Sequence, residues 1–223
     1  NPIELDVLKN FKNKIIKFLM KHLYKSANLI IGISKELSKD LKKLCNTKVV
    51  TIYNPSFDKN LYYLSKEKIN IKNKKKIILN IGRFEKQKNH LMLLRSFKES
   101  LKKIDSHLLL IGYGSEIISI KKFIIENNLK KNVSIINNPK NPYKFFKIAN
   151  LFILTSLYEG FGNVLVEAGM FKIPIISTKC KSGPKEILNY GKYGDLVNIN
   201  DEVGLTNLIV KNLKKVDRRK ISL

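Results

Sequence analysis

Short apolar segments alternate regularly with amphipathic segments from Lys76 to the end of the chain. The apolar segments have the length of buried strands, and the segments between them space apolar residues as one face of a helix does. This alternation predicts an α/β fold in which helices cover both faces of a parallel, Rossmann-like, doubly wound sheet. The predicted strands are 77–81, 107–112, 133–136, 151–155, 174–177 and 195–198, and the predicted helices are 91–104, 115–128, 142–148, 163–171, 184–189 and 201–214.

The first 55 residues contain a shorter version of the same pattern. Apolar residues at helical spacing, interleaved with lysines, predict a basic amphipathic helix over 8–24. We expect this helix either to lie on a membrane surface or to pack on the sheet with a solvated lysine face. A strand over 28–34, a helix capped by Ser34 that ends at Leu44, and a strand over 49–53 follow.

The most informative motif runs from Ser156 to Glu167. A buried strand leads into two glycines, and a helical pattern begins near Asn163. Such a turn presents backbone N–H groups at the positive end of a helix, which suits phosphate or sugar oxygens. Glu159 and Glu167 bracket this cradle, so the motif suggests a ligand with phosphates and hydroxyls, such as a nucleotide-sugar. The alternative is an ordinary strand-to-helix turn with one solvated and one capping glutamate.

Three further stretches accompany this motif in a characteristic order. A strand with a Gly-Arg…Lys loop spans 80–88, a strand with a Gly-x-Gly turn spans 108–115, and a strand with a Ser-Gly-Pro-x-Glu helix start spans 174–188. Together with the two glutamates eight positions apart over 159–167, these stretches resemble the retaining glycosyltransferases of family four, which have the GT-B fold. The resemblance extends over most of the chain.

The resemblance implies two parts of a GT-B fold. Residues 1–55 would be the C-terminal end of an acceptor-side, Rossmann-like domain, and residues 56–223 would be the nucleotide-sugar-binding domain. Asn54-Pro55 matches the crossing between the domains, and the polar, lysine-rich stretch 58–76 suits a solvated connection. Because the chain lacks an initiator Met and opens within a pattern, we expect a piece of a longer protein that is inactive alone.

The resemblance assigns Glu159, Arg83 and Lys88 to catalysis. Arg83 and Lys88 match positions that bind the donor diphosphate without a metal, where fixed cations stabilise the charge that the leaving group gains. Glu159 matches the acid that contacts the transferred sugar near its anomeric carbon. The alternative is that the two cations are ordinary charges of a lysine-rich protein.

The implied donor site extends over the whole cradle. Glu167 matches an acid that accepts hydrogen bonds from the ribose, and the turn near Ile136 matches the one that holds the base. At that turn the chain has Asn137-Asn138-Pro139 where the family has an aromatic residue and Gly. The expected donor-binding residues are Gly82, Arg83, Lys88, Ile136, Glu159, Gly160, Phe161, Gly162, Asn163, Val164, Leu165 and Glu167.

No metal and no cofactor are expected beside the nucleotide-sugar substrate. No Cys/His/Asp group has the spacing of metal ligands, and the Asp-x-Asp pattern of metal-dependent glycosyltransferases is absent. We interpret His90 as a residue at the start of a helix rather than a catalyst. Glu186 is interpreted as an acid at the beginning of a helix, outside the site.

The implied reaction transfers a sugar from a nucleotide donor to a sugar hydroxyl with retention of configuration. The stretch 182–188 most resembles bacterial enzymes that build lipid-linked oligosaccharide, capsule or lipopolysaccharide from UDP-sugars, often UDP-N-acetylhexosamines. Two alternatives stay open: a nucleotide-sugar epimerase on the same fold, and a basic nucleic-acid-binding or membrane-binding module with a vestigial sugar site. The Glu159 and Glu167 pattern argues against the epimerase.

The net charge of +25 comes from 43 Lys and Arg against 18 Asp and Glu. These cations are scattered, without zinc-finger spacing or an RNA-binding aromatic motif, so we expect an anionic membrane surface as a partner and no nucleic acid. Two cysteines give no disulfide framework, and no apolar run approaches the ~20 residues of a membrane span. The expected location is the cytoplasm, peripheral at the inner face of the cytoplasmic membrane, with a UDP-sugar donor and a glycan or lipid-linked glycan acceptor.

Overall fold

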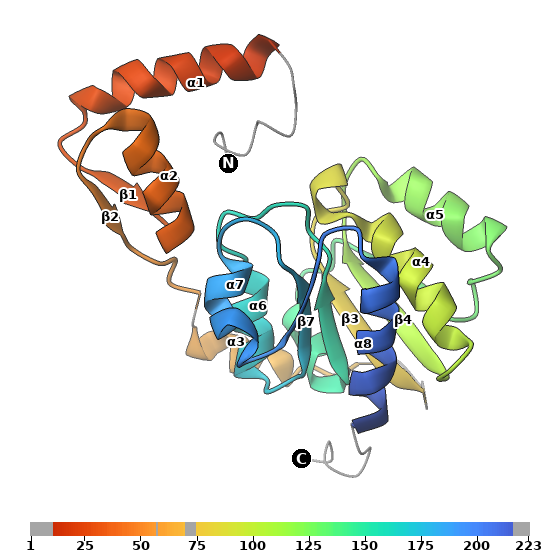
Figure 1. Cartoon of the computed structure of the whole chain (residues 1–223). Coiled ribbons are helices and arrows are strands. Elements are labelled where there is room, and N and C mark those ends of the chain that lie inside the picture. The colour runs from red at the N-terminus through yellow and green to blue at the C-terminus, as the bar shows by residue number, and fades with distance from the viewer. Residues whose placement is uncertain (1–10, 57, 70–74, 216–223) are drawn as a thin grey trace.

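The computed structural model describes residues 11–56, 58–69 and 75–215. Figure 1 shows a large unit, in which helices cover an open sheet, and a smaller unit formed by the N-terminal helices and strands. Residues from both units line the candidate site.

The large unit is built on a six-stranded parallel sheet, as predicted. Its strand order is β5-β4-β3-β6-β7-β8. The chain proceeds outward from β3 in one direction and then returns to β3 to build the other half from β6, which is the doubly wound arrangement. The strands are β3 (Lys76–Ile81), β4 (Ser106–Gly112), β5 (Val133–Asn137), β6 (Leu151–Leu154), β7 (Ile175–Thr178) and β8 (Asp195–Val197).

Helices cover both faces because successive strand residues point to opposite faces of the sheet. Ile78 packs in one apolar cluster with α4, α5 and α8, and Leu79 packs in the other with η4, α6 and α7. The helices are η3 (Lys86–Lys88), α4 (His90–Leu101), α5 (Ile117–Glu126), η4 (Tyr143–Ile148), α6 (Asn163–Met170), α7 (Pro184–Ile187), η5 (Asn189–Gly191) and α8 (Glu202–Lys215). The predicted helices are confirmed, except that residues 143–148 form a 3₁₀ helix.

The prediction of a purely solvated connection over 58–76 is wrong, because this stretch contains helix α3 (Lys59–Ser65). The Asp58 carboxylate caps the helix by accepting the Asn60 N–H at 2.8 Å. Leu61 is buried, and α3 packs against η4. Leu61 is the one buried apolar residue of α3, and a single buried position does not give the periodic apolar pattern from which a helix is predicted.

The smaller unit contains the elements predicted for the start of the chain. They are α1 (Phe11–Leu23), η2 (Tyr24–Ser26), β1 (Ile30–Gly32), α2 (Lys35–Cys45) and β2 (Val49–Thr51). The two strands form a parallel pair of their own. The predicted cap is confirmed, since Ser34 Oγ accepts the Leu37 N–H at 3.2 Å. The first residues of the predicted helix 8–24 lie outside the described residues.

Helix α1 has one packed side and one exposed apolar side. Met20 is buried, and Ile16 and Tyr24 pack around it in the core of the smaller unit. Four apolar side chains on the other side of α1 are exposed: Ile15, Phe18, Leu19 and Leu23. The exposed side of the helix is therefore not formed by lysines alone. Within the described ranges, no helix combines the length and the apolar composition that a membrane crossing requires.

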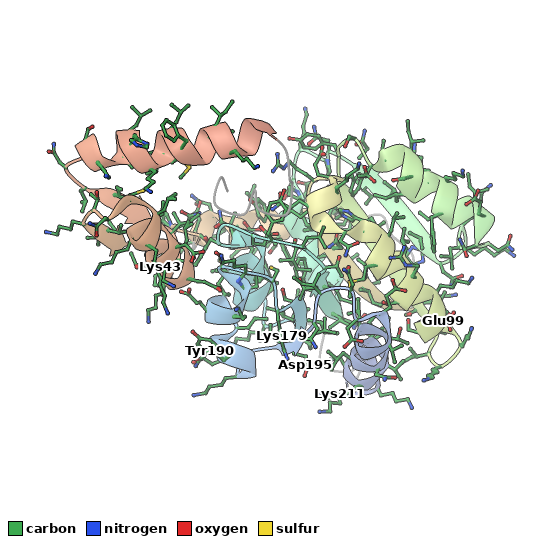
Figure 2. The ribbon with its side chains drawn as sticks, turned by 45° about the horizontal axis from the view of Figure 1, so that its top comes forward. Lys43, Glu99, Lys179, Tyr190, Asp195 and Lys211 are labelled. Carbon is green, nitrogen blue, oxygen red and sulfur yellow. The ribbon has the colours of Figure 1, made fainter. Side chains whose placement is uncertain are left out.

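The positive charge is spread over separate elements. The lysines labelled in Figure 2 belong to α2 (Lys43), to the chain after β7 (Lys179) and to α8 (Lys211). Lys211 is paired with Asp195, with Nζ 3.0 Å from Oδ1.

Candidate functional site

A cavity of about 410 Å³ lies where β3 and β6 end, at the switch point of the strand order. Ligands of doubly wound sheets bind at this position, outside the carboxyl ends of the strands. Most of the predicted site residues line it: Gly82, Arg83, Lys88, Glu159, Phe161, Gly162, Asn163, Val164 and Glu167. Four residues that were not predicted line it as well: Asn54, Ile81, Pro142 and Tyr143.

Three predicted donor-binding residues do not line this cavity. Ile136 lies on β5 and packs partly against the core. The Leu165 side chain is buried in the same core. Gly160 lies against the smaller unit, because a Cβ added there would meet Ile33 Cδ1 at 3.1 Å.

The structure joins two of the predicted catalytic residues in one ion pair. Lys88 Nζ lies 2.5 Å from Glu159 Oε1, and both side chains are largely buried, at 14% and 8% exposure. Ser156 Oγ donates to the same oxygen at 2.5 Å. No described residue bonds the second oxygen, Oε2, which leaves it available to a ligand. Ser156 was not predicted, although its place three residues before Glu159 at the end of β6 is a usable signal.

The loops that follow β3 and β6 are joined by hydrogen bonds to backbone carbonyl groups. The Leu157 N–H donates to Gln87 O at 2.8 Å, and Gln87 Nε2 donates to Tyr158 O at 2.7 Å. Thr155 Oγ1 donates to Lys88 O at 2.9 Å. These bonds fix the backbone on both sides of the ion pair, so Lys88 and Glu159 are held before any ligand arrives.

The glycines of the cradle let the backbone turn toward the cavity. Gly162, the residue before α6, has a φ of 101°, which favours glycine. No side chain caps α6, and the Leu165 N–H donates to Gly162 O at 2.9 Å, so the N–H groups of Asn163 and Val164 are the ones that stay available to an anion. Gly183 packs against the cradle, since a Cβ added there would lie 1.8 Å from Phe161 O.

Burial shifts the pKa of two further groups that line the cavity, Glu167 and Tyr143. Burial raises the pKa of the Glu167 carboxyl, which disfavours its ionised form. The pKa of Tyr143 is also raised, first by burial and then by the negative charges of Glu167 and Asp58. Hydroxyl donors of a ligand would stabilise the ionised Glu167 carboxylate, because they replace the water that burial removes. Arg83 is exposed at the rim of the cavity.

His90 is the first residue of α4, and it is buried outside the cavity. Its Nε2 lies 3.0 Å from Asn80 Oδ1, and its ring packs edge-on against Phe84 at 5.0 Å. Since the Asn80 amide donates to Ile153 O, the neutral imidazole must donate through Nε2. Nδ1 is buried without a partner among the described residues. Burial, with a smaller contribution from Lys88, lowers the pKa of His90 to about 4.

We expect His90 to destabilise the fold as the pH falls. Its folded pKa lies below its unfolded value of 6.5, so the stability it contributes is present above pH 6.5 and is lost progressively toward pH 4. Between pH 7 and pH 5 this loss is about 2 kcal/mol. Urea unfolding at both pH values should show a smaller decrease for His90→Gln than for the wild type. Equal decreases would contradict the assignment.

The fold and the cavity together define a class. A sheet of this order, with cations and carboxylates at its switch point, is typical of nucleotide-binding domains. The family model described as "Glycosyl transferases group 1" matches residues 64–221, and the chain belongs to this family.

Relatives support the same family over the whole chain. The chain is 34% identical to an uncharacterised glycosyltransferase of Methanocaldococcus jannaschii, covering 99% of the chain and 63% of the relative. It is 32% identical to the Campylobacter jejuni N-acetylgalactosamine-N,N'-diacetylbacillosaminyl-diphospho-undecaprenol 4-alpha-N-acetylgalactosaminyltransferase, covering 90% and 55%. An Anabaena protein solved in complex with UDP and glucose superposes with a TM-score of 0.79 at 20% identity, covering 96% and 60%. The chain thus spans about 55–63% of these two curated relatives.

Proposed function

We propose that the chain is the donor-binding half of a retaining glycosyltransferase that takes its sugar from UDP. The cavity at the switch point carries this proposal, because it gathers Arg83 and Lys88, an uncapped helix start, and two acids. These groups match the two halves of a nucleotide-sugar, which are a diphosphate and a set of hydroxyls. In this proposal residues 1–55 belong to the acceptor-side domain, and residues 56–223 to the donor-side domain.

Each half of the donor has a partner in the cavity. As the bond between the anomeric carbon and the diphosphate breaks, negative charge builds on the diphosphate, and Arg83 and Lys88 stabilise it. Glu159 Oε2 faces the transferred sugar, while Oε1 is held by Lys88 and Ser156. Glu167 accepts the ribose hydroxyls. Because the cations are part of the chain, the diphosphate needs no metal for its neutralisation.

UDP is the proposed nucleotide because of what similar proteins bind. The Anabaena structure contains UDP and glucose, and the Campylobacter relative is named for an N-acetylgalactosaminyl transfer. A UDP-N-acetylhexosamine is therefore the proposed donor. The proposed acceptor is a glycan in bacterial surface-glycan synthesis.

The proposed place of action is an anionic membrane surface. The Campylobacter relative is named for a sugar that is linked to diphospho-undecaprenol, a polyisoprenoid lipid. On this chain, the exposed apolar side of α1 lies next to exposed Lys14 and Lys21, a combination that binds anionic lipid. Flotation with vesicles tests this part: equal binding to neutral and anionic vesicles would contradict it.

We expect UDP to bind this chain in the presence of a chelator. Isothermal titration calorimetry should give the same affinity with EDTA and with added manganese, because Arg83 and Lys88 supply the positive charge. ADP and GDP serve as matched ligands with the same diphosphate and should bind more weakly. Binding that vanishes in EDTA and returns with manganese would contradict the proposal, and a preference for ADP or GDP would contradict UDP.

A further inference from the structure

The smaller unit and the donor unit are joined by glutamates that cap each other's backbone. Glu186, in the first turn of α7, accepts the N–H groups of Lys35 and Glu36 at 2.9 and 2.8 Å. These residues form the first turn of α2, whose dipole favours a negative charge there. The Tyr53 hydroxyl donates to the same carboxylate at 3.1 Å. Figure 1 shows one end of α2 directed toward the region of α6 and α7.

The capping is reciprocal. Glu36, in the first turn of α2, accepts the Ser182 N–H at 2.8 Å and pairs with Lys185 at 3.4 Å. An ion pair between Lys181 and Asp40, at 2.6 Å, lies alongside. We name the bonds of Glu36 and Glu186 to backbone N–H groups the carboxylate clasp. Both glutamates bond to groups more than 140 positions away in sequence, so the clasp acts between the two units.

The clasp is mechanically connected to the cradle. The turn that donates to Glu36 contains Gly183, whose Cα lies so close to Phe161 O that no side chain fits between them. On the other side, the Tyr53 ring packs 5.5 Å from the Phe161 ring. The residue after Tyr53, Asn54, lines the cavity and donates through Nδ2 to Asn163 Oδ1 at 3.2 Å.

We propose that Glu36 and Glu186 are positioning residues that hold the smaller unit on the donor cradle and so set one wall of the donor cavity. Neither touches the cavity itself, so each acts through Tyr53, Asn54 and the turn at Gly183. The inference rests on the proposed function only where UDP is used as the probe. It predicts that the clasp and UDP strengthen each other, since coupling between two sites is reciprocal.

Hydrogen exchange of backbone amides tests the clasp without UDP. In Glu186→Ala, the amides of Lys35 and Glu36 lose their acceptor, and we expect Ser182 to lose protection about tenfold as well. Ser182 keeps its own acceptor in this variant, so its loss shows that the clasp opens as one unit. Glu126→Ala, which removes an exposed glutamate on α5, is the matched control and should change none of these amides. Unchanged protection at Ser182 would overturn the clasp.

UDP affinity then tests the positioning role. We expect Glu186→Ala and Glu36→Ala each to weaken UDP binding about three- to tenfold, with Glu126→Ala unchanged. Saturating UDP should restore part of the protection at Ser182 in Glu186→Ala and at Lys35 in Glu36→Ala, because each of these amides keeps its acceptor in that variant. Wild-type affinity for UDP in both variants would overturn the positioning role.

If the wild-type chain binds no UDP, the proposed function fails while the exchange result still decides the clasp. If Glu186→Ala does not fold, Glu186→Gln carries the comparison at Ser182, and Glu36→Ala carries it at Lys35, whose acceptor Glu186 it keeps.

Discussion

In the complete glycosyltransferase, we expect Glu159→Gln to lower the maximal rate about 10²- to 10³-fold. Positive charge builds at the anomeric carbon as the diphosphate departs, and a fixed carboxylate beside that carbon stabilises the transition state more than the bound donor. Glutamine keeps the shape and one acceptor but carries no negative charge. The variant therefore separates charge from geometry at this position.

The ion pair of Glu159 explains why UDP binding should survive this substitution. Lys88 Nζ lies 2.5 Å from the carboxylate, so the acid partly neutralises a cation that we propose to bind the diphosphate. In the variant Lys88 is free to turn fully to the diphosphate, and we expect an unchanged or higher affinity. The same loss leaves a largely buried ammonium without its partner, so the melting temperature should fall.

Calorimetry on this chain and steady-state rates on the complete protein check both parts. Glu126→Gln is the control, because it makes the same chemical change at an exposed site on α5. Loss of UDP binding with a preserved rate would show that Glu159 holds the nucleotide and not the reacting sugar. That result would overturn the placement of the donor.

The architecture could be predicted from the sequence because most strands of the sheet are recognisable from a few consecutive residues. Strands β3, β4, β6 and β7 each contain a short apolar run, and the loops at the switch point directly follow β3 and β6. The sequence therefore predicts that the loops after β3 and β6 lie at the same edge of the sheet. The structure agrees, because Arg83, Lys88, Glu159 and Glu167 line one cavity there. Helix α3 gives no clear helical pattern, because Leu61 is its only apolar side chain that is buried and its other apolar residues are exposed neighbours.

The contacts between distant segments could not be predicted in the same way. Asn54 and Tyr143 reach the cavity from the connection and from η4, and no local pattern marks them as neighbours of the cradle. Glu186 follows the rule for an acid at a helix start, and its own position suggests no further partner. Its carboxylate instead caps α2, 150 positions earlier in the chain. Such pairings depend on how two units pack, which one sequence does not encode locally.

We expect Glu167→Ala to weaken UDP binding roughly ten- to a hundredfold. The loss corresponds to about 1.5–3 kcal/mol for the hydrogen bonds between a carboxylate and the ribose hydroxyls. These bonds exist before and during the reaction, so the maximal rate at saturating donor should change much less than the affinity. Calorimetry with UDP and a rate measurement at saturating donor check the two parts. A wild-type affinity in the variant would place the ribose elsewhere.

Glu167→Gln separates a binding role from a structural one through the sign of its effect on stability. Burial raises the pKa of Glu167 in the fold, so the group favours folding below its usual pKa and loses that contribution as the pH rises through the raised value. At pH 7 its buried charge therefore opposes folding. Without UDP, the neutral glutamine should raise the melting temperature at pH 7, and the difference from the wild type should shrink toward about pH 4. With UDP the order should reverse, since only the carboxylate gains charge-assisted bonds from the ribose. A variant that is less stable at pH 7 without UDP would mean that Glu167 supports the fold and not the donor.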